Sequence, residues 1–130
     1  MRQRIAIVQR DIAWCDAKAN CQAIEAMLEG IDADVVVLAE MFQTGFVVRP
    51  DAVADSGETL EWMLQLSRRK SAAVVGSVAV SVDGTYRNRM YFVMPDGRVE
   101  YYDKRHLFSV GGEAENYMAG AERKVVCWRG

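Results

Sequence analysis

Glu40 and Lys104 each follow an apolar, strand-like run, and together they offer a base and a cation for hydrolysis. Glu40 comes directly after Val35–Ala39 (VVVLA), and Lys104 lies just past a run that ends at Tyr102. Strand ends are where α/β proteins place their ligand sites. A partly desolvated carboxylate suits proton transfer, and a fixed ammonium can stabilise an oxyanion. A solvated Glu40 and a surface Lys104 beside Arg105 remain the alternatives.

Three further residues in the segment after Lys104 could take part in chemistry. Glu113 occurs in GGEAENY, where the preceding glycines let the backbone bring a side chain inward. Glu115 in the same loop is nearly as good a candidate. His106 is the only histidine, and without a neighbouring Cys or Ser motif it is more typical of a structural role.

The three cysteines show neither metal-ligand spacing nor even pairing, which favours free thiols and a cytoplasmic setting. Cys21 falls on the inner face of a predicted helix and is expected to pack in the core. Cys15 precedes that helix without an acid-base partner nearby. Cys127 alternates with the apolar Val126 and Trp128, so we expect an outward strand residue rather than a nucleophile. The familiar serine-hydrolase, phosphate-loop and zinc motifs are missing.

Composition is that of an ordinary globular chain. The 130 residues suit one domain, with 51% hydrophobic and 26% charged residues. A net charge of −2 gives no reason to expect nucleic acid or an acidic membrane surface as partner. The longest apolar runs are far too short to span a membrane, and the start lacks the apolar core of a signal peptide.

The first half of the chain alternates strands and helices. Arg4–Gln9 predicts a strand buried on both faces, and Val35–Ala39 a second one. A helix should begin at Asp16 as N-cap and stop at Gly30. Its inner face should contain Ala17, Cys21, Ile24, Leu28 and Ile31. A second helix is predicted over Thr59–Lys70, with Leu60, Met63, Leu64 and Ser67 inward.

The second half has a strand rhythm. Ala73–Val82 and Tyr86–Met94 should form a hairpin around Asp83-Gly84, and Val99–Tyr102 another strand after the turn at residues 95–97. Residues 104–123 look like a loop, and Lys124–Trp128 begins a last strand. The order predicts an α/β fold with a mixed sheet. Because no turn or helix follows the last strand, we expect a fragment of a larger domain.

Taken in order, these segments resemble the nitrilase superfamily over essentially the whole chain. VVVLAEMFQTGF (Val35–Phe46) is similar to its first signature, with an apolar strand, Glu, and then Thr-Gly-aromatic. YRNRMYFVMPDGRVEYYDKRHLF (Tyr86–Phe108) is similar to its second, and Gly112–Gly120 to the acidic loop that follows. The run Tyr-Asp-Lys-Arg-His-Leu-Phe is similar to the omega-amidase branch in particular.

The resemblance implies a four-layer α-β-β-α sandwich, of which residues 1–130 would be the N-terminal half with a mixed sheet and two helices. It implies that Glu40 is the general base, Lys104 the oxyanion-stabilising lysine and Glu113 the second glutamate. These three should converge, because a parallel pairing of the strands that end near Glu40 and Lys104 would bring both residues to one edge of the sheet. The family's nucleophilic Cys would lie just past residue 130, and none of the three cysteines matches it. The chain alone is then expected to be inactive. Neither metal nor cofactor is implied.

The implied function is hydrolysis of small amides, with release of ammonia through a Cys thioester. The substrates would be omega-amides of 2-oxo dicarboxylic acids such as 2-oxoglutaramate, and nitrilase or carbamoylase activity stays open. Phe42 and Phe46 could form the pocket wall or belong to the core. A non-catalytic α/β binding module or inactive fragment is the alternative. We expect no nucleic-acid or membrane partner, and a homo-oligomer because one sheet face would lack cover.

Overall fold

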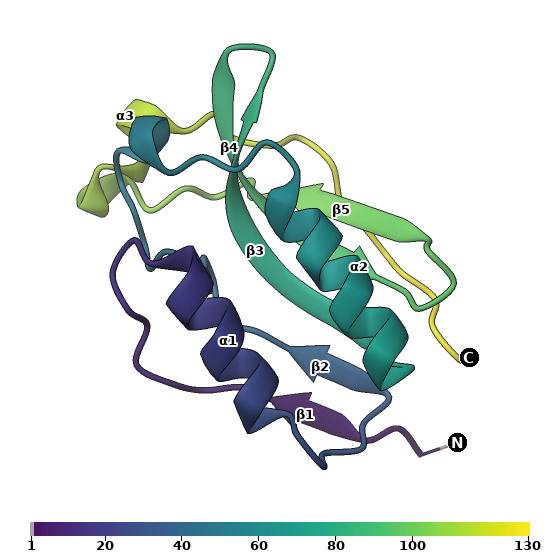
Figure 1. Cartoon of the computed structure of the whole chain (residues 1–130). Helices are drawn as coiled ribbons and strands as arrows, with labels where there is room; N and C mark the ends of the chain where they lie inside the picture. Colours follow the sequence, from purple (N-terminus) through teal and green to yellow (C-terminus); the bar gives the residue numbers. More distant parts are fainter. Residues whose placement is uncertain (1) are drawn as a thin grey trace.

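The fold is a single mixed β-sheet with its two long helices on one face (Figure 1). The computed structural model describes residues 2–130. The sheet has five strands in the order β1-β2-β3-β4-β5; β1, β2 and β3 pair in parallel, and β3, β4 and β5 antiparallel. The elements are β1 (Ile5–Ile7), α1 (Ala17–Met27), β2 (Val35–Val37), η1 (Pro50–Ala52), α2 (Glu58–Lys70), β3 (Ala73–Val82), β4 (Thr85–Val93), β5 (Val99–Asp103), η2 (Ser109–Gly111) and α3 (Glu113–Asn116). The α/β class predicted from the sequence is confirmed.

Helix α1 begins and ends as its sequence predicts. The Asp16 carboxylate accepts a hydrogen bond from the backbone N–H of Ala19 at 2.9 Å, which satisfies a free donor of the first turn. Gly30 adopts a φ of +70° just past the helix, where a side chain would be strained. Ile24 and Leu28 are buried in the core. Ile31 is exposed, because the helix has already ended, so its predicted inward position is wrong.

Helix α2 covers the middle of the sheet. Met63, Leu66 and Ser67 are buried, and the Ser67 hydroxyl donates to the backbone oxygen of Ala72 at 2.6 Å. The predicted inner residues Leu60 and Leu64 are partly buried at the side of this face. The main core therefore lies between the two helices and the sheet face that they cover.

The hairpin of β3 and β4 agrees with its prediction. Asp83 and Gly84 both have positive φ, as the tight turn requires.

Strand β1 differs from its prediction. It is only three residues long, and Ile5 and Ile7 are 59% and 74% exposed, so burial on both faces is wrong. The physical reason is that β1 is an edge strand whose opposite face carries no helix in the described part of the chain.

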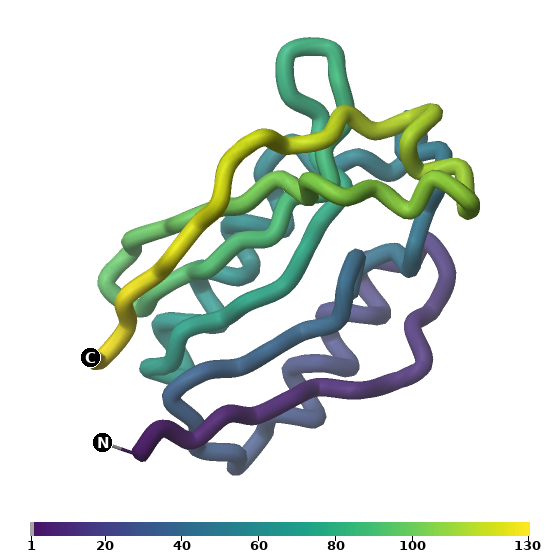
Figure 2. The backbone as a smooth tube through the Cα atoms, turned by 180° about the vertical axis from the view of Figure 1, so that it is seen from behind, coloured from purple at the N-terminus to yellow at the C-terminus, as the bar shows by residue number. Residues whose placement is uncertain are grey.

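The C-terminal third differs most from expectation. Residues 104–123 contain the short helices η2 and α3 rather than loop alone. Residues 124–128 form no strand, because they make no backbone ladder with the described residues. The segment is instead attached through side chains: Lys124 pairs with Glu100 at 2.8 Å, and the Trp128 indole donates to the backbone oxygen of Asp34 at 3.0 Å. Figure 2 shows it running beside β5 on the helix-free face.

Strand direction decides where the candidate residues meet. Since β4 is antiparallel to both β3 and β5, β5 runs in the same direction as β2. The two strands therefore end at the same edge of the sheet, although β3 and β4 separate them. β2 and β5 thus have the parallel direction that was expected. They do not pair with each other, so the expected pairing is wrong. Among residues 2–130, no helix is long and apolar enough to cross a membrane.

Candidate active site

The Lys104 ammonium lies between two carboxylates at the edge of the sheet where β2 and β5 end. Its Nζ is 2.9 Å from Glu40 Oε1 and 2.9 Å from Glu113 Oε2. The Glu113 side chain is completely buried, whereas that of Glu40 is 47% exposed and can reach solvent. The predicted convergence of these three residues is confirmed, and it brings an acid-base group beside a fixed cation.

Glu40 is held by the turn that follows β2. The next residue, Met41, is fully buried and has a φ of +48°, which few residues other than glycine adopt. Its backbone N–H donates to the Ser77 hydroxyl on β3 at 2.9 Å, and its carbonyl accepts from the Gly45 N–H at 2.9 Å. The unusual backbone therefore turns Glu40 out of the sheet and keeps it at the strand end.

Lys104 is fixed through its backbone on both sides. Its N–H donates to the Asn88 carbonyl on β4, and its carbonyl accepts from the Gly120 N–H, both at 2.9 Å. A side chain at Gly120 would place its Cβ 2.2 Å from the backbone oxygen of Asp103, so only glycine permits this approach. Asp103 itself forms two hydrogen bonds with the Arg89 guanidinium, of 2.7 and 3.0 Å.

Glu113 opens the short helix α3 and points inward. Burial raises the pKa of this carboxyl, but hydrogen bonds from the Phe108 backbone, Asn88 and Lys104 outweigh burial and lower the pKa below its usual value. For Lys104, burial opposes the charged form, yet the bonds to Glu113 and Glu40 raise the pKa. The ion pair is therefore charged at neutral pH. Glu115, the alternative candidate, is exposed on the outside of α3.

Three residues of this site were missed from the sequence. Asn88 is buried on β4, and its amide donates to Glu40 at 2.7 Å and to Glu113 at 2.9 Å. Ser77 holds the turn at Met41, as described above. Tyr117 donates its hydroxyl hydrogen to the Val47 carbonyl at 2.6 Å and so ties α3 to the loop after β2. The one signal that the sequence offered was an asparagine in the middle of a predicted strand, between Arg87 and Arg89.

The two phenylalanines have different surroundings. Phe42 is buried in the core, against Gly76 and at 5.6 Å, centroid to centroid, from the Trp62 ring. It fits the core alternative. Phe46 lies beside the site, with its ring centroid 5.3 Å from Lys104 Nζ and its ring edge-on to Phe108. Phe46 thus lies next to Lys104, and its place in a pocket wall stays a prediction.

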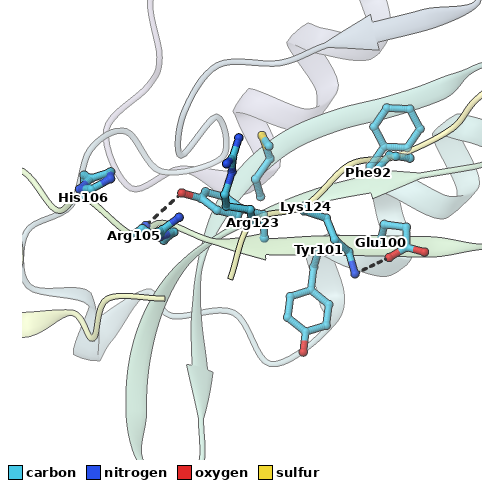
Figure 3. A pocket seen from close by; sticks show the side chains of 10 residues that line it. Phe92, Glu100, Tyr101, Arg105, His106, Arg123 and Lys124 are labelled. Atoms are coloured by element: carbon cyan, nitrogen blue, oxygen red, sulfur yellow. Dashed lines mark hydrogen bonds and ion pairs between the residues drawn. The ribbon is translucent and has the colours of Figure 1, made fainter. Parts of the chain in front are cut away.

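A hollow of about 230 Å³ adjoins the catalytic candidates on the helix-free face of the sheet. Met90 and Tyr102 form its border with a second hollow of about 350 Å³. That second hollow has basic residues around an apolar floor (Figure 3). They are Arg105, His106, Arg123 and Lys124, the last paired with Glu100. His106 is exposed there and forms no part of the Lys104 cluster.

None of the cysteines lines the hollow beside Lys104. Cys15 and Cys127 are exposed, and Cys21 on α1 packs against the core behind the sheet. Burial first, and then Glu25 and Asp55, raise the pKa of the Cys21 thiol to about 11. Within residues 2–130, no group of His, Cys, Asp and Glu side chains is arranged to hold a metal ion. The cluster therefore contains a base and a cation without a thiol of its own.

The chain belongs to the carbon-nitrogen hydrolase family, whose family model matches residues 4–129. It is 42% identical to the omega-amidase YafV of Yersinia enterocolitica over 129 residues, which cover 98% of this chain and 50% of that protein. It is 39% identical to omega-amidase YafV of Escherichia coli K12, again over 98% of this chain and 50% of the relative. The chain thus spans about half the length of these curated relatives.

Solved structures agree with this assignment. The CN-hydrolase superfamily protein XC1258 of Xanthomonas campestris, which carries an arsenic adduct in its active site, superposes with a TM-score of 0.94 at 36% identity. The match covers 99% of this chain and 51% of XC1258. An amidase from Nesterenkonia sp. AN1 has a TM-score of 0.83 at 20% identity, covering 99% of this chain and 54% of that one, which shows a common fold alone. The nitrilase-like fold expected from the resemblance is confirmed.

Proposed function

We propose that this chain carries the base and the oxyanion-stabilising part of an amidase active site. The observation that supports this most directly is the Lys104 ammonium held at 2.9 Å from both Glu40 and Glu113. A buried carboxylate fixes the cation, and a half-exposed carboxylate remains available to a reacting molecule. Such a fixed cation is worth most in a site where it need not reorganise as charge develops.

In the proposed reaction a cysteine thiol gives its proton to Glu40, and the thiolate attacks the amide carbonyl carbon. The carbonyl electrons move to oxygen, where Lys104 stabilises the negative charge. The intermediate collapses, the C–N bond breaks, and Glu40 returns the proton to the departing ammonia. Water activated by Glu40 then cleaves the thioester to a carboxylate and the free thiol. Because no cysteine lines the hollow, the thiol would come from residues other than these 130.

For the substrate we propose omega-amides of 2-oxo dicarboxylic acids, such as 2-oxoglutaramate. The similarity to the YafV relatives supports this class. The second hollow supports it independently, because Arg105 and Arg123 could bind the carboxylate at the far end of such a molecule. We also propose that the protein acts in the cytoplasm, from its unpaired thiols, and as a homo-oligomer, from its uncovered sheet face.

The test is ammonia release by the product of the complete reading frame. Glu40→Gln and Lys104→Met should each lower kcat on the order of 10³-fold or more. Glu115→Gln, on the exposed side of α3, is the matched control and should retain activity. A nitrile and an N-carbamoyl amino acid, offered beside 2-oxoglutaramate, separate the three enzyme classes. Full activity in Lys104→Met, or no turnover of any substrate, would reject the proposal and favour a binding module.

A further inference from the structure

Asn88 contacts all three members of the cluster. Its side-chain Nδ2 donates to Glu40 Oε1 at 2.7 Å and to Glu113 Oε1 at 2.9 Å. Its backbone carbonyl accepts from the Lys104 N–H at 2.9 Å. Asn88 is buried and belongs to β4, which pairs with strands on both sides, so its backbone is held by hydrogen bonds to both neighbours.

The direction of these hydrogen bonds follows from the chemistry of the partners. Ionised carboxylates only accept hydrogen bonds, so the amide nitrogen of Asn88 must face them. That nitrogen has two hydrogens, and there are two carboxylates within reach. Donor and acceptor numbers therefore match without protonating either glutamate.

Asparagine also suits the charge of the cluster. Glu40, Glu113 and Lys104 together carry one net negative charge when all are ionised. A cationic residue at position 88 would neutralise it and weaken the base, whereas an acidic one would repel both carboxylates. A neutral donor of two hydrogen bonds holds the carboxylates in place and leaves the negative charge intact.

The two bonds to Glu40 also distinguish its oxygens. Oε1 accepts from both Asn88 and Lys104, at 2.7 and 2.9 Å. Oε2 accepts no hydrogen bond from the described residues, and the half-exposed side chain leaves it open to the hollow. Without Asn88, Lys104 alone would bind the Glu40 carboxylate, and a single ammonium can pair with either oxygen.

We propose that Asn88 is a positioning residue that locks the Glu40 carboxylate through Oε1, so that Oε2 is the atom that takes and returns the proton. This inference rests on the proposed amidase function. It predicts that Asn88 acts on the rate of proton transfer more than on substrate binding, because its amide nitrogen already donates both hydrogens to the carboxylates, although Asn88 also borders the hollow.

The experiment uses the product of the complete reading frame with Asn88→Asp and Asn88→Leu. Both remove the two donors, and the first also adds a third carboxylate. We expect kcat to fall on the order of 10²-fold with KM changed less than about 3-fold. The acid limb of the pH profile of kcat/KM should move to higher pH, most in Asn88→Asp, because loss of the Asn88 hydrogen bond raises the pKa of Glu113, the buried partner of Lys104.

Asn20 offers a matched control. It is equally buried, and its Nδ2 likewise donates two hydrogen bonds, to the carbonyls of Ala13 and Gln43. Asn20→Asp therefore loses the same number of buried donors away from Lys104. It should lower the melting temperature without moving the acid limb. If Asn88→Asp and Asn88→Leu do not fold, Asn88→Ser, which is smaller and keeps one donor, replaces them. Its kcat should fall, and its acid limb should move, by less than is expected for those two variants.

A second readout does not depend on turnover. Carbon-13 NMR titration of the glutamate carboxyls should show Glu113 protonating at higher pH in the folded Asn88 variants than in the parent protein, because the Asn88 hydrogen bond lowers its pKa. If the parent releases no ammonia, the amidase proposal fails and the titration still decides whether Asn88 holds the carboxylates. Unchanged kcat, pH profile and carboxyl titration in a folded Asn88→Leu variant would overturn the inference.

Discussion

The Glu113 carboxylate and the Lys104 ammonium lie 2.9 Å apart, and the Glu113 side chain is completely buried. A buried carboxylate is costly unless its oxygens are bonded. Glu113 meets this need with hydrogen bonds from Phe108, Asn88 and Lys104, and so attaches the loop after β5 to the sheet. The pair is therefore a structural joint as well as part of the site.

The first prediction concerns removal of that buried charge. Glu113→Gln should lower the free energy of unfolding at pH 7 by about 2–3 kcal/mol, because Lys104 loses its buried partner but keeps Glu40. Folding lowers the Glu113 pKa, so its contribution is full above its ordinary value of 4.5 and is lost as pH falls. The difference from the parent should shrink below pH 4.5. Urea unfolding at pH 7 and at low pH, with exposed Glu115→Gln as control, measures both effects; a constant difference would contradict it.

The second prediction concerns the turn behind Glu40. Ser77→Ala removes the acceptor for the buried Met41 N–H, which should cost about 1–3 kcal/mol of unfolding free energy. Because that bond holds the strained backbone next to Glu40, kcat should fall more than KM rises. Ser81→Ala, on the same strand but exposed, should leave both quantities unchanged. Equal effects of the two substitutions on stability and kcat would show that Ser77 is dispensable.

The third prediction concerns the end of β5. Arg89 forms two hydrogen bonds to Asp103, next to Lys104, and stacks 4.0 Å above the Tyr101 ring. Lysine cannot reproduce the paired geometry, so Arg89→Lys should cost about 1–2 kcal/mol. Arg98→Lys, whose partner Asp96 is exposed, should cost less than about 0.5 kcal/mol. Thermal unfolding of the two variants side by side provides the comparison.

The fourth prediction concerns the thiols. With its pKa raised to about 11, Cys21 should react with iodoacetamide at pH 8 on the order of 100-fold more slowly than an ordinary thiol. Peptide mass spectrometry should find exposed Cys15 and Cys127 alkylated first.

The same arrangement of thiols predicts that the 130-residue chain by itself releases no ammonia from 2-oxoglutaramate, since none of these thiols faces Lys104. Turnover that disappears in Cys127→Ser would identify Cys127 as the nucleophile and refute this assignment.

The fifth prediction concerns the helix-free face of the sheet. Ile5 and Ile7 on edge strand β1, together with Met90 on β4, expose apolar side chains, and an edge strand also exposes unpaired backbone groups. The isolated chain should therefore self-associate at micromolar concentration. Ile5→Ser with Ile7→Ser should reduce this self-association, whereas Ile31→Ser, which is exposed in the turn after α1, should not. Sedimentation velocity decides; a 14.6 kDa monomer of the parent chain would contradict the prediction.

The sequence alone predicted the elements that depend on interactions between residues close together in the chain. Asp16 is an N-cap because its carboxylate reaches a backbone N–H three residues on, and Asp83-Gly84 is a tight turn because both residues tolerate positive φ. Strand-end positions made Glu40 and Lys104 candidates, and the resemblance of the motifs to the nitrilase superfamily gave them their expected roles. Each of these features depends on residues close together in the chain.

The tertiary structure decided everything that depends on distant partners. Glu113 rather than Glu115 faces Lys104 because helix α3 turns one of them into the sheet edge. Residues 124–128 form no strand, and β1 is exposed, because each depends on which segments lie alongside. Asn88 belongs to the site because β4 lies between β3 and β5 in the sheet. Hydrogen bonds within the cluster join residues up to 64 positions apart, and such contacts leave no local signature because chain geometry alone does not determine them.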